Sequence, residues 1–209
     1  MKKYLVEFLG TFFLVATIGN TVLPPNDAGA MAPLAIAGVL VAMVFAGGHV
    51  SGAHYNPAVT ISVFLRGRCS AADVPGYIVA QLAAAIAAAG AVIFLKGASA
   101  LAPMQIDVMR ALVAEFLYTF ALCTVILNVA TSRGTSGNSF YGLAIGLTVL
   151  AGAYSVGAIS GGAFNPAVAV GATLLGLFDV ANIWVYLVAQ FAAAAAAAAV
   201  FKFTAAEAS

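Results

Sequence analysis

The fold is decided by two matching segments, SGAHYNPAV at residues 51–59 and SGGAFNPAV at residues 160–168. Each contains an Asn-Pro-Ala box that is suited to open a helix, because Asn is a favoured N-cap and Pro is favoured at the first helical position. A single box would often mark only the start of a helix after a loop. Two boxes at matching positions, each after a Ser-Gly-rich segment, indicate a shared functional element. The box residues are Asn56, Pro57, Ala58, Asn165, Pro166 and Ala167.

The sequence around the boxes also repeats. EFLGTF begins at Glu7 and EFLYTF at Glu115, an offset of 108 residues, and YIVAQ ends at Gln81 and YLVAQ at Gln190, an offset of 109 residues. We therefore expect a single domain, residues 1–209, made of repeats at about 1–97 and 108–209. Each repeat holds three candidate membrane spans, and an odd number makes the second repeat enter the membrane from the opposite side. Inverted repeats of this kind place their site near the middle of the bilayer.

The composition excludes an ordinary soluble protein. Hydrophobic residues make up 64% of the chain and charged residues only 7%, whereas soluble proteins contain about 45–50% and about 25%. The net charge of +1 and the lack of a Lys/Arg cluster argue against a nucleic-acid partner. Cys69 and Cys123 do not form a metal-binding spacing with His49 and His54. We therefore expect no metal and no cofactor, and we expect both thiols to be packing or loop residues.

Six stretches are long enough to span a bilayer as helices, which takes about 20 residues. They are Tyr4–Leu23, Ala32–Val50, Val74–Leu95, Ala111–Ala130, Ser139–Ala158 and Val180–Phe201. Two further apolar segments, Asn56–Leu65 and Asn165–Phe178, are too short to span. Irregular backbone at membrane depth is tolerated only where it is buried in protein or lines a water-filled cavity. The sequence thus predicts an all-α membrane protein with six transmembrane helices and two re-entrant half-helices that enclose a pore or cavity.

Lys and Arg placement predicts the orientation, since these residues concentrate in cytoplasmic loops. With the N-terminus inside, the cytoplasmic side holds Lys2, Lys3, Arg66, Arg68, Arg133 and Lys202, and the other side holds Lys96 and Arg110. This distribution favours a multi-pass protein of the cell membrane with both termini in the cytoplasm.

The two boxes, the two Glu-Phe-Leu starts and the two Val-Ala-Gln segments resemble the aquaporin (major intrinsic protein) family over almost the whole chain. The resemblance implies that the half-helices meet at the bilayer centre and that both Asn amides donate into one narrow pore. The positive half-helix dipole ends would then exclude cations and protons. The expected partners are the lipid bilayer, water, small neutral solutes and further copies of the chain in a homotetramer. The backbone carbonyls expected to line the pore are those of Gly52, Ala53, His54, Tyr55, Gly161, Gly162, Ala163 and Phe164.

Several polar residues within the apolar segments need an explanation. The resemblance implies that Glu7 and Glu115 accept hydrogen bonds from the re-entrant loops and hold them in shape, and a proton relay is the alternative. We expect Gln81 and Gln190 to satisfy loop carbonyls or to line the centre. For His54, a packing role and a pH-gating role both stay open.

The expected outer filter departs from the family pattern. Most water-selective members have an Arg directly after the second box, where this chain has Val168. Spacing from the boxes places the other filter positions at Ile36, Ala153 and Gly162. The inferred filter is apolar and wide, unless Tyr154 or Phe164 narrows it. It should admit neutral solutes such as glycerol, urea, ammonia, hydrogen peroxide or metalloid hydroxides.

Other functional classes stay open at this point. Inverted repeats also build alternating-access transporters, which normally need ionisable residues at the midplane. A non-conducting structural membrane protein with the same fold is a further alternative. The chain is not expected to be an enzyme, because the sequence shows no nucleophile with a base and no phosphate-binding loop.

Overall fold

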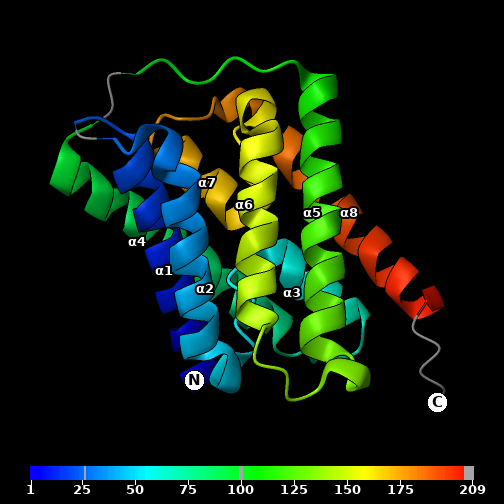
Figure 1. Cartoon of the computed structure of the whole chain (residues 1–209). Coiled ribbons are helices and arrows are strands. Elements are labelled where there is room, and N and C mark those ends of the chain that lie inside the picture. Colours follow the sequence, from blue (N-terminus) through cyan, green and yellow to red (C-terminus); the bar gives the residue numbers. More distant parts are fainter. Residues whose placement is uncertain (26, 99–100, 205–209) are drawn as a thin grey trace.

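The computed structural model describes residues 1–25, 27–98 and 101–204, and these residues form a bundle of helices (Figure 1). Six helices are long and apolar enough to cross a membrane among the residues that the structure describes. They are α1 (Lys2–Val22), α2 (Ala32–Ser51), α4 (Val74–Lys96), α5 (Val108–Thr131), α6 (Tyr141–Ser160) and α8 (Ile183–Thr204). Two short helices, α3 (Pro57–Leu65) and α7 (Pro166–Leu174), lie inside the bundle. The predicted fold class is confirmed.

Short 3-10 turns and caps explain where the observed helices differ from the predicted ranges. The second half-helix ends at Leu174 rather than Phe178, because the backbone turns at Gly176, which has a φ of 73°. A 3-10 turn, η3 (Val180–Asn182), precedes α8, so this helix starts later than predicted. Helix α5 starts earlier, because Asp107 Oδ1 accepts a hydrogen bond from Arg110 N and caps the first turn. Two further 3-10 turns are η1 (Gly29–Met31) and η2 (Arg133–Thr135).

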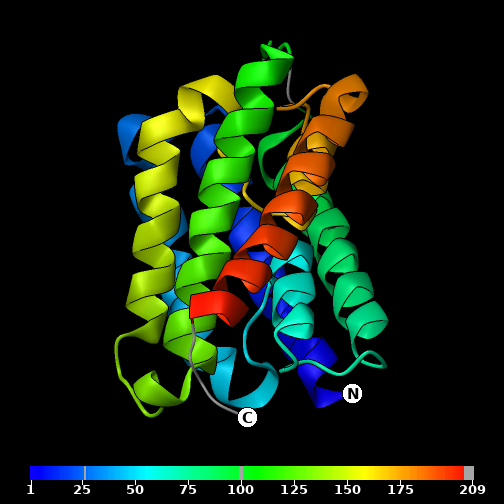
Figure 2. The same cartoon turned by 90° about the vertical axis from the view of Figure 1, so that its right-hand side faces the viewer.

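Each half-helix packs across the boundary between the two repeats. Helix α3, from the first repeat, has its most extensive contacts with α8, and α7, from the second repeat, has its most extensive contacts with α4. Helices α3 and α7 approach each other in the centre of the bundle. The start of α1 and the end of α8 lie at the same end of the molecule, which is clear in the view turned by 90° (Figure 2). The centre of the bundle is therefore built jointly by both repeats.

Small residues allow the helices to approach closely. A Cβ added at Gly146 would lie 2.3 Å from Val41 Cγ2 and 2.9 Å from the backbone oxygen of Ala37 on α2. A Cβ added at Gly142 would lie 3.0 Å from the ring of Phe45, also on α2. Gly142 and Gly146 therefore let α6 pack closely against α2, as small residues do in membrane bundles.

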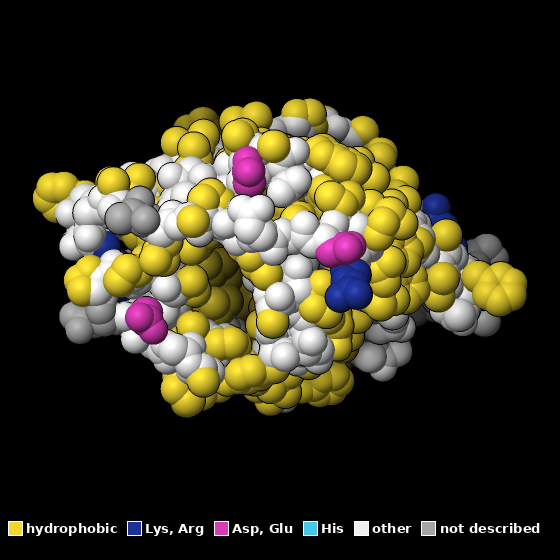
Figure 3. Space-filling model, turned by 90° about the horizontal axis from the view of Figure 1, so that it is seen from above, with side chains coloured by type: hydrophobic (Ala, Val, Ile, Leu, Met, Phe, Trp, Pro, Cys, Tyr) yellow, Lys and Arg dark blue, Asp and Glu magenta, His cyan; other side chains and the backbone are white. Residues whose placement is uncertain are grey.

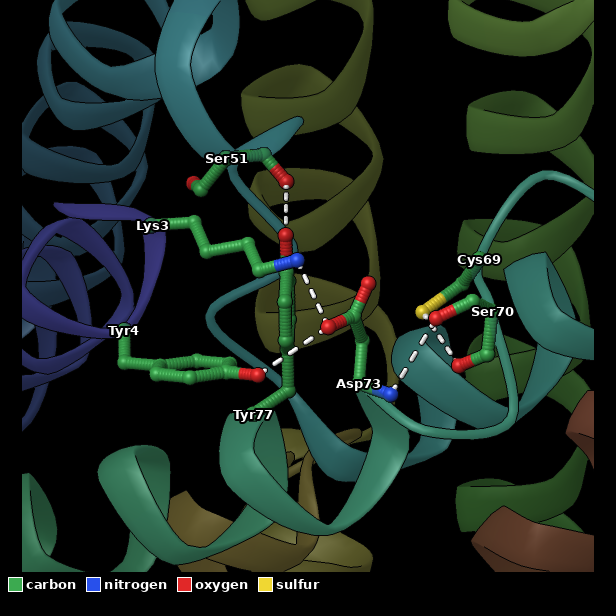
Figure 4. A network of polar contacts seen from close by, with 7 residues as sticks. All are labelled: Lys3, Tyr4, Ser51, Cys69, Ser70, Asp73 and Tyr77. Atoms are coloured by element: carbon green, nitrogen blue, oxygen red, sulfur yellow. Dashed lines mark hydrogen bonds and ion pairs between the residues drawn. The ribbon is translucent and has the colours of Figure 1, made fainter. Parts of the chain in front are cut away.

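At the end of the bundle that holds the start of α1, a polar network ties this helix to the α3–α4 connection (Figure 4). Lys3 Nζ lies 2.6 Å from Asp73 Oδ1, and the Tyr4 hydroxyl donates to the same oxygen at 3.0 Å. The backbone N–H of Asp73 donates to Ser70 Oγ at 3.2 Å. The bonds from Lys3, Ser70 and Tyr4 hold the pKa of Asp73 at about 2, below its ordinary value of 3.8. The network therefore stabilises the fold above pH 3.8, and this contribution is lost as the pH falls through about 2.

The tight contact at Gly146 predicts a strong position dependence for glycine-to-alanine changes. Gly146→Ala should destabilise the protein by about 1–3 kcal/mol, because Val41 and the α2 backbone leave no room for a methyl group. Gly38→Ala on α2 is the matched control, since its Cβ would meet nothing within 4 Å, and it should be neutral or stabilising by about 0.5–1 kcal/mol. Thermal unfolding in detergent measures both. Equal melting temperatures for the two variants would contradict the packing contact.

Candidate functional site

The two Asn-Pro-Ala boxes form matching N-caps at the facing ends of α3 and α7. The Asn residue has extended backbone in both boxes, and its Oδ1 accepts hydrogen bonds from the second and third helical N–H groups. For Asn56 the donors are Ala58 at 2.8 Å and Val59 at 3.4 Å, and for Asn165 they are Ala167 at 2.9 Å and Val168 at 3.4 Å. Because each Oδ1 is held by its own helix, the orientation of each amide group is fixed.

The two amide groups also join the loops to each other. Asn56 Nδ2 donates to the backbone oxygen of Phe164 at 2.9 Å, and Asn165 Nδ2 donates to the backbone oxygen of Tyr55 at 2.8 Å. Each amide nitrogen carries two protons, so this bond leaves one further proton on each Asn. Both Asn residues line the central cavity, which places that remaining donor beside it.

Both loops adopt a left-handed backbone that is uncommon outside glycine. Ala53, Tyr55 and Phe164 have φ values of 51°, 49° and 49°, and Gly162 has a φ of 66°. Such conformations persist only where the surroundings determine them. The left-handed residues turn the backbone N–H groups toward the protein, where two buried carboxylates accept them.

The buried carboxylates belong to Glu7 and Glu115, and both side chains are fully buried. Glu7 accepts hydrogen bonds from Ser51 Oγ at 2.7 Å, His54 N at 2.9 Å, Tyr55 N at 2.7 Å and Gln81 Nε2 at 2.8 Å. Glu115 accepts the matching bonds from Ser160 Oγ at 2.7 Å, Ala163 N at 2.9 Å, Phe164 N at 2.8 Å and Gln190 Nε2 at 2.8 Å. The structure thus brings each glutamate to the loop that it was expected to hold.

The expectation for the two glutamines is wrong. Gln81 and Gln190 donate to the glutamates instead of satisfying loop carbonyls, and neither is among the described residues that line the central cavity. Gln81 Nε2 donates a second bond, to Thr60 Oγ1 at 3.0 Å. The physical reason is that a buried carboxylate has four acceptor sites, and the loop N–H groups and serine occupy only three of them.

Two tyrosines support the loops, and no prediction from the sequence included them. The Tyr77 hydroxyl donates to the backbone oxygen of Ser51 at 2.7 Å, a bond that is visible in Figure 4. The Tyr186 hydroxyl donates to the backbone oxygen of Ser160, also at 2.7 Å. The available signal was the Tyr that begins each of the repeated YIVAQ and YLVAQ segments.

A cavity of about 420 Å³ extends along the two loops. The described residues that line it include no charged side chain, and most of their side chains are apolar. Figure 3 views the end of the bundle opposite the chain termini and shows a hollow there, lined by hydrophobic side chains. The proposed filter residues all line the cavity: Ile36, Ala153, Gly162 and Val168.

Most of the predicted carbonyl-bearing loop residues also line this cavity, namely Ala53, His54, Tyr55, Gly161, Gly162, Ala163 and Phe164. Gly52 lies instead beside a second cavity, of about 600 Å³, which His49 and Arg68 also line. Gly52 forms the left-handed C-cap of α2, with a φ of 83°, and its counterpart Gly161, the left-handed C-cap of α6, lines the central cavity. The carbonyls of Tyr55 and Phe164 accept the Asn bonds, which the sequence did not indicate.

Of the two aromatic residues considered as narrowing the filter, Tyr154 lies away from the central cavity, whereas Phe164 lines it and has its ring beside Gly162. Tyr154 is 58% exposed, its hydroxyl donates to the backbone oxygen of Ala30 at 2.8 Å, and it does not line the described cavity wall. The Phe164 ring is buried and packs on Tyr118, with ring centroids 5.5 Å apart. His54 lines the cavity, and its Nδ1 lies 3.2 Å from Thr60 Oγ1.

The carboxylate bonds predict that the glutamates matter for stability. Glu7→Ala should lower the melting temperature strongly, because each buried donor left without its acceptor costs about 1–3 kcal/mol. Leu5→Ala on the same helix is the control, since Leu5 is 60% exposed and should change stability little. Thermal unfolding in detergent and solute flux are measured together on each variant. Normal stability of Glu7→Ala with abolished flux would instead support a direct transport role.

Comparison with known proteins agrees with this arrangement. The family model described as "Major intrinsic protein" matches residues 1–201. An X-ray structure of the aquaglyceroporin from Plasmodium falciparum has the same fold, with a TM-score of 0.83, 23% identity, and coverage of 98% of this chain and 96% of that chain.

Similar curated proteins come from plants and bacteria. "Aquaporin NIP1-4" from Oryza sativa subsp. japonica is 38% identical over 207 residues, covering 95% of this chain and 75% of that protein. "Glycerol uptake facilitator protein-like 6" from Lactiplantibacillus plantarum is 38% identical over 198 residues, covering 90% of this chain and 91% of that protein. With its helices, paired boxes and these relatives, the chain belongs to the major intrinsic protein family, the aquaporin family of membrane channels.

Proposed function

We propose that this chain is a passive channel for small neutral solutes and water, with an outer filter that admits molecules larger than water. The observation that carries the proposal is the apolar cavity wall at Ile36, Ala153, Gly162 and Val168. None of these side chains can donate a hydrogen bond, so the filter lacks the polar match by which a narrow pore would favour water. Size and polarity of the solute then decide passage.

The names of the relatives support water and glycerol as solutes. One is called an aquaporin and another a glycerol uptake facilitator. Glycerol, urea, ammonia, hydrogen peroxide and metalloid hydroxides are the candidate solutes. They are small and neutral, as an uncharged cavity wall requires.

Ion exclusion is proposed to arise at the paired Asn caps. Helices α3 and α7 each have their N-terminus at the loop junction, where the positive ends of both helix dipoles repel cations. The remaining Asn amide protons are available to a passing solute oxygen. This donor pair would orient a water molecule at the junction and interrupt proton transfer along the water chain.

Orientation and assembly follow as parts of the same proposal. Helix α1 starts and α8 ends at the same end of the bundle, and the Lys and Arg distribution favours the cytoplasm for that end. We place the chain in the cell membrane, and the family resemblance supports a homotetramer.

The proposal predicts that flux is passive. In proteoliposomes, stopped-flow light scattering should show glycerol or urea entry that follows the gradient and is unchanged by a protonophore. The reason is that the described cavity wall holds no charged side chain that could couple ion movement. Loss of flux with the protonophore, or exclusion of every solute larger than water, would overturn the proposal.

A second prediction concerns the filter itself. Val168→Arg should reduce glycerol or urea permeability more than water permeability, because the guanidinium would project five donors and a charge into the cavity. Val168→Leu is the control, since it adds bulk without charge and should reduce solute flux less. The measured quantity is the ratio of solute to water permeability on equal amounts of folded protein. An unchanged ratio in Val168→Arg would show that this residue does not line the constriction.

A further inference from the structure

The connection between α4 and α5 crosses the end of the bundle opposite the chain termini (Figure 1). Within its described part, the backbone N–H of Met104 donates to the backbone oxygen of Leu177 at 2.9 Å. Met104 and Phe178 form an isolated parallel bridge at this point. The connection is therefore attached to the segment that joins α7 to α8, and it passes beside the mouth of the cavity.

Both partners of this attachment are held in place. The Phe178 ring is buried and stacks on Tyr186 with centroids 4.6 Å apart. On the other side of Met104, Ile106 packs against the main hydrophobic core, and Asp107 caps α5. The backbone is thus fixed at Met104 itself and again at Ile106 and Asp107, and these contacts do not use the methionine side chain.

Met104 is the residue of this connection that lines the central cavity, among the described residues 97, 98 and 101–107. It lines the cavity together with Pro33, Ile36 and Phe178, and it is half-buried. Met109, a few residues later, is 68% exposed and lies outside the cavity lining. Of these two methionines, only Met104 therefore lines the cavity.

We propose that Met104 is a further determinant of solute size, which completes the outer filter on the side of the α4–α5 connection. This inference rests on the proposed function of the cavity as a solute channel. Two of the four filter positions, Ala153 and Gly162, carry little or no side chain, so the larger side chains that line the same cavity, including Met104, have more influence on its width. A methionine has three rotatable bonds and no donor, and it can therefore adapt to solutes while excluding those that are too large.

The first test is Met104→Ala, with Met109→Ala as the matched control. Truncation should raise the permeability of a four- or five-carbon polyol relative to glycerol by about threefold, which corresponds to about 0.6 kcal/mol in the barrier. Water permeability should change less, because water already passes the untruncated filter. The backbone bond to Leu177 does not involve the side chain and should persist. Met109→Ala should leave the polyol ratio at the wild-type value.

A second test places a reactive group at the same position. Met104→Cys in a Cys69→Ser background is treated with a methanethiosulfonate reagent bearing a trimethylammonium group, and Met109→Cys is the control. Labelling at position 104 should reduce glycerol flux, a reducing agent should restore it, and labelling at position 109 should leave flux unchanged. The remaining thiol, Cys123, is fully buried.

The outcomes separate this inference from the proposed function. If the wild type passes no solute larger than water, the proposed function fails, and the inference fails with it. If the wild type passes glycerol but Met104→Ala keeps the wild-type polyol ratio and labelled Met104→Cys keeps full flux, only the inference is overturned. If Met104→Ala folds poorly, labelled Met104→Cys decides in its place: loss of glycerol flux supports the inference, and full flux overturns it.

Discussion

The structure depends on two buried carboxylates that accept backbone N–H groups from loops inside the bundle. Irregular backbone in an apolar environment leaves donors without partners, and each such donor is costly. Glu7 and Glu115 remove that cost for both loops, with a serine hydroxyl and a glutamine amide completing each carboxylate. The left-handed residues at Tyr55 and Phe164 persist because their N–H groups are held in this way.

The geometry of the site depends on these carboxylates step by step. Once the loops are held, the Asn residues that follow them cap α3 and α7 and reach across to the opposite loop. The capped helices start beside the cavity, and α7 carries Val168 to its wall. Substitutions of Glu7, Glu115 or their hydrogen-bond partners should therefore affect the whole site, whereas substitutions at the cavity wall should affect only which solutes pass.

Much of the fold could be predicted because the relevant signals are local or repeated. Long apolar runs predict the spans, and the paired boxes at Asn56 and Asn165 predict the half-helices. The predicted end of α7 at Phe178 is wrong because Leu175–Phe178 continues the apolar run of the half-helix. The helix ends earlier because the backbone turns at one left-handed glycine, Gly176. The contacts of Gln81 and the position of Met104 could not be predicted, because each depends on a partner far away in the chain.

The reciprocal bonds between the Asn side chains and the opposite loops also bear on how such a chain can evolve. Asn56 reaches an oxygen of the second repeat, and Asn165 reaches an oxygen of the first, so each half supplies what the other lacks. The bonded oxygens belong to the backbone, which every amino acid provides. The side chains at matching positions of the two halves can therefore differ, as His54 and Ala163 do, while the shared junction is kept. A duplicated ancestor could acquire an asymmetric solute path without first giving up its symmetric centre.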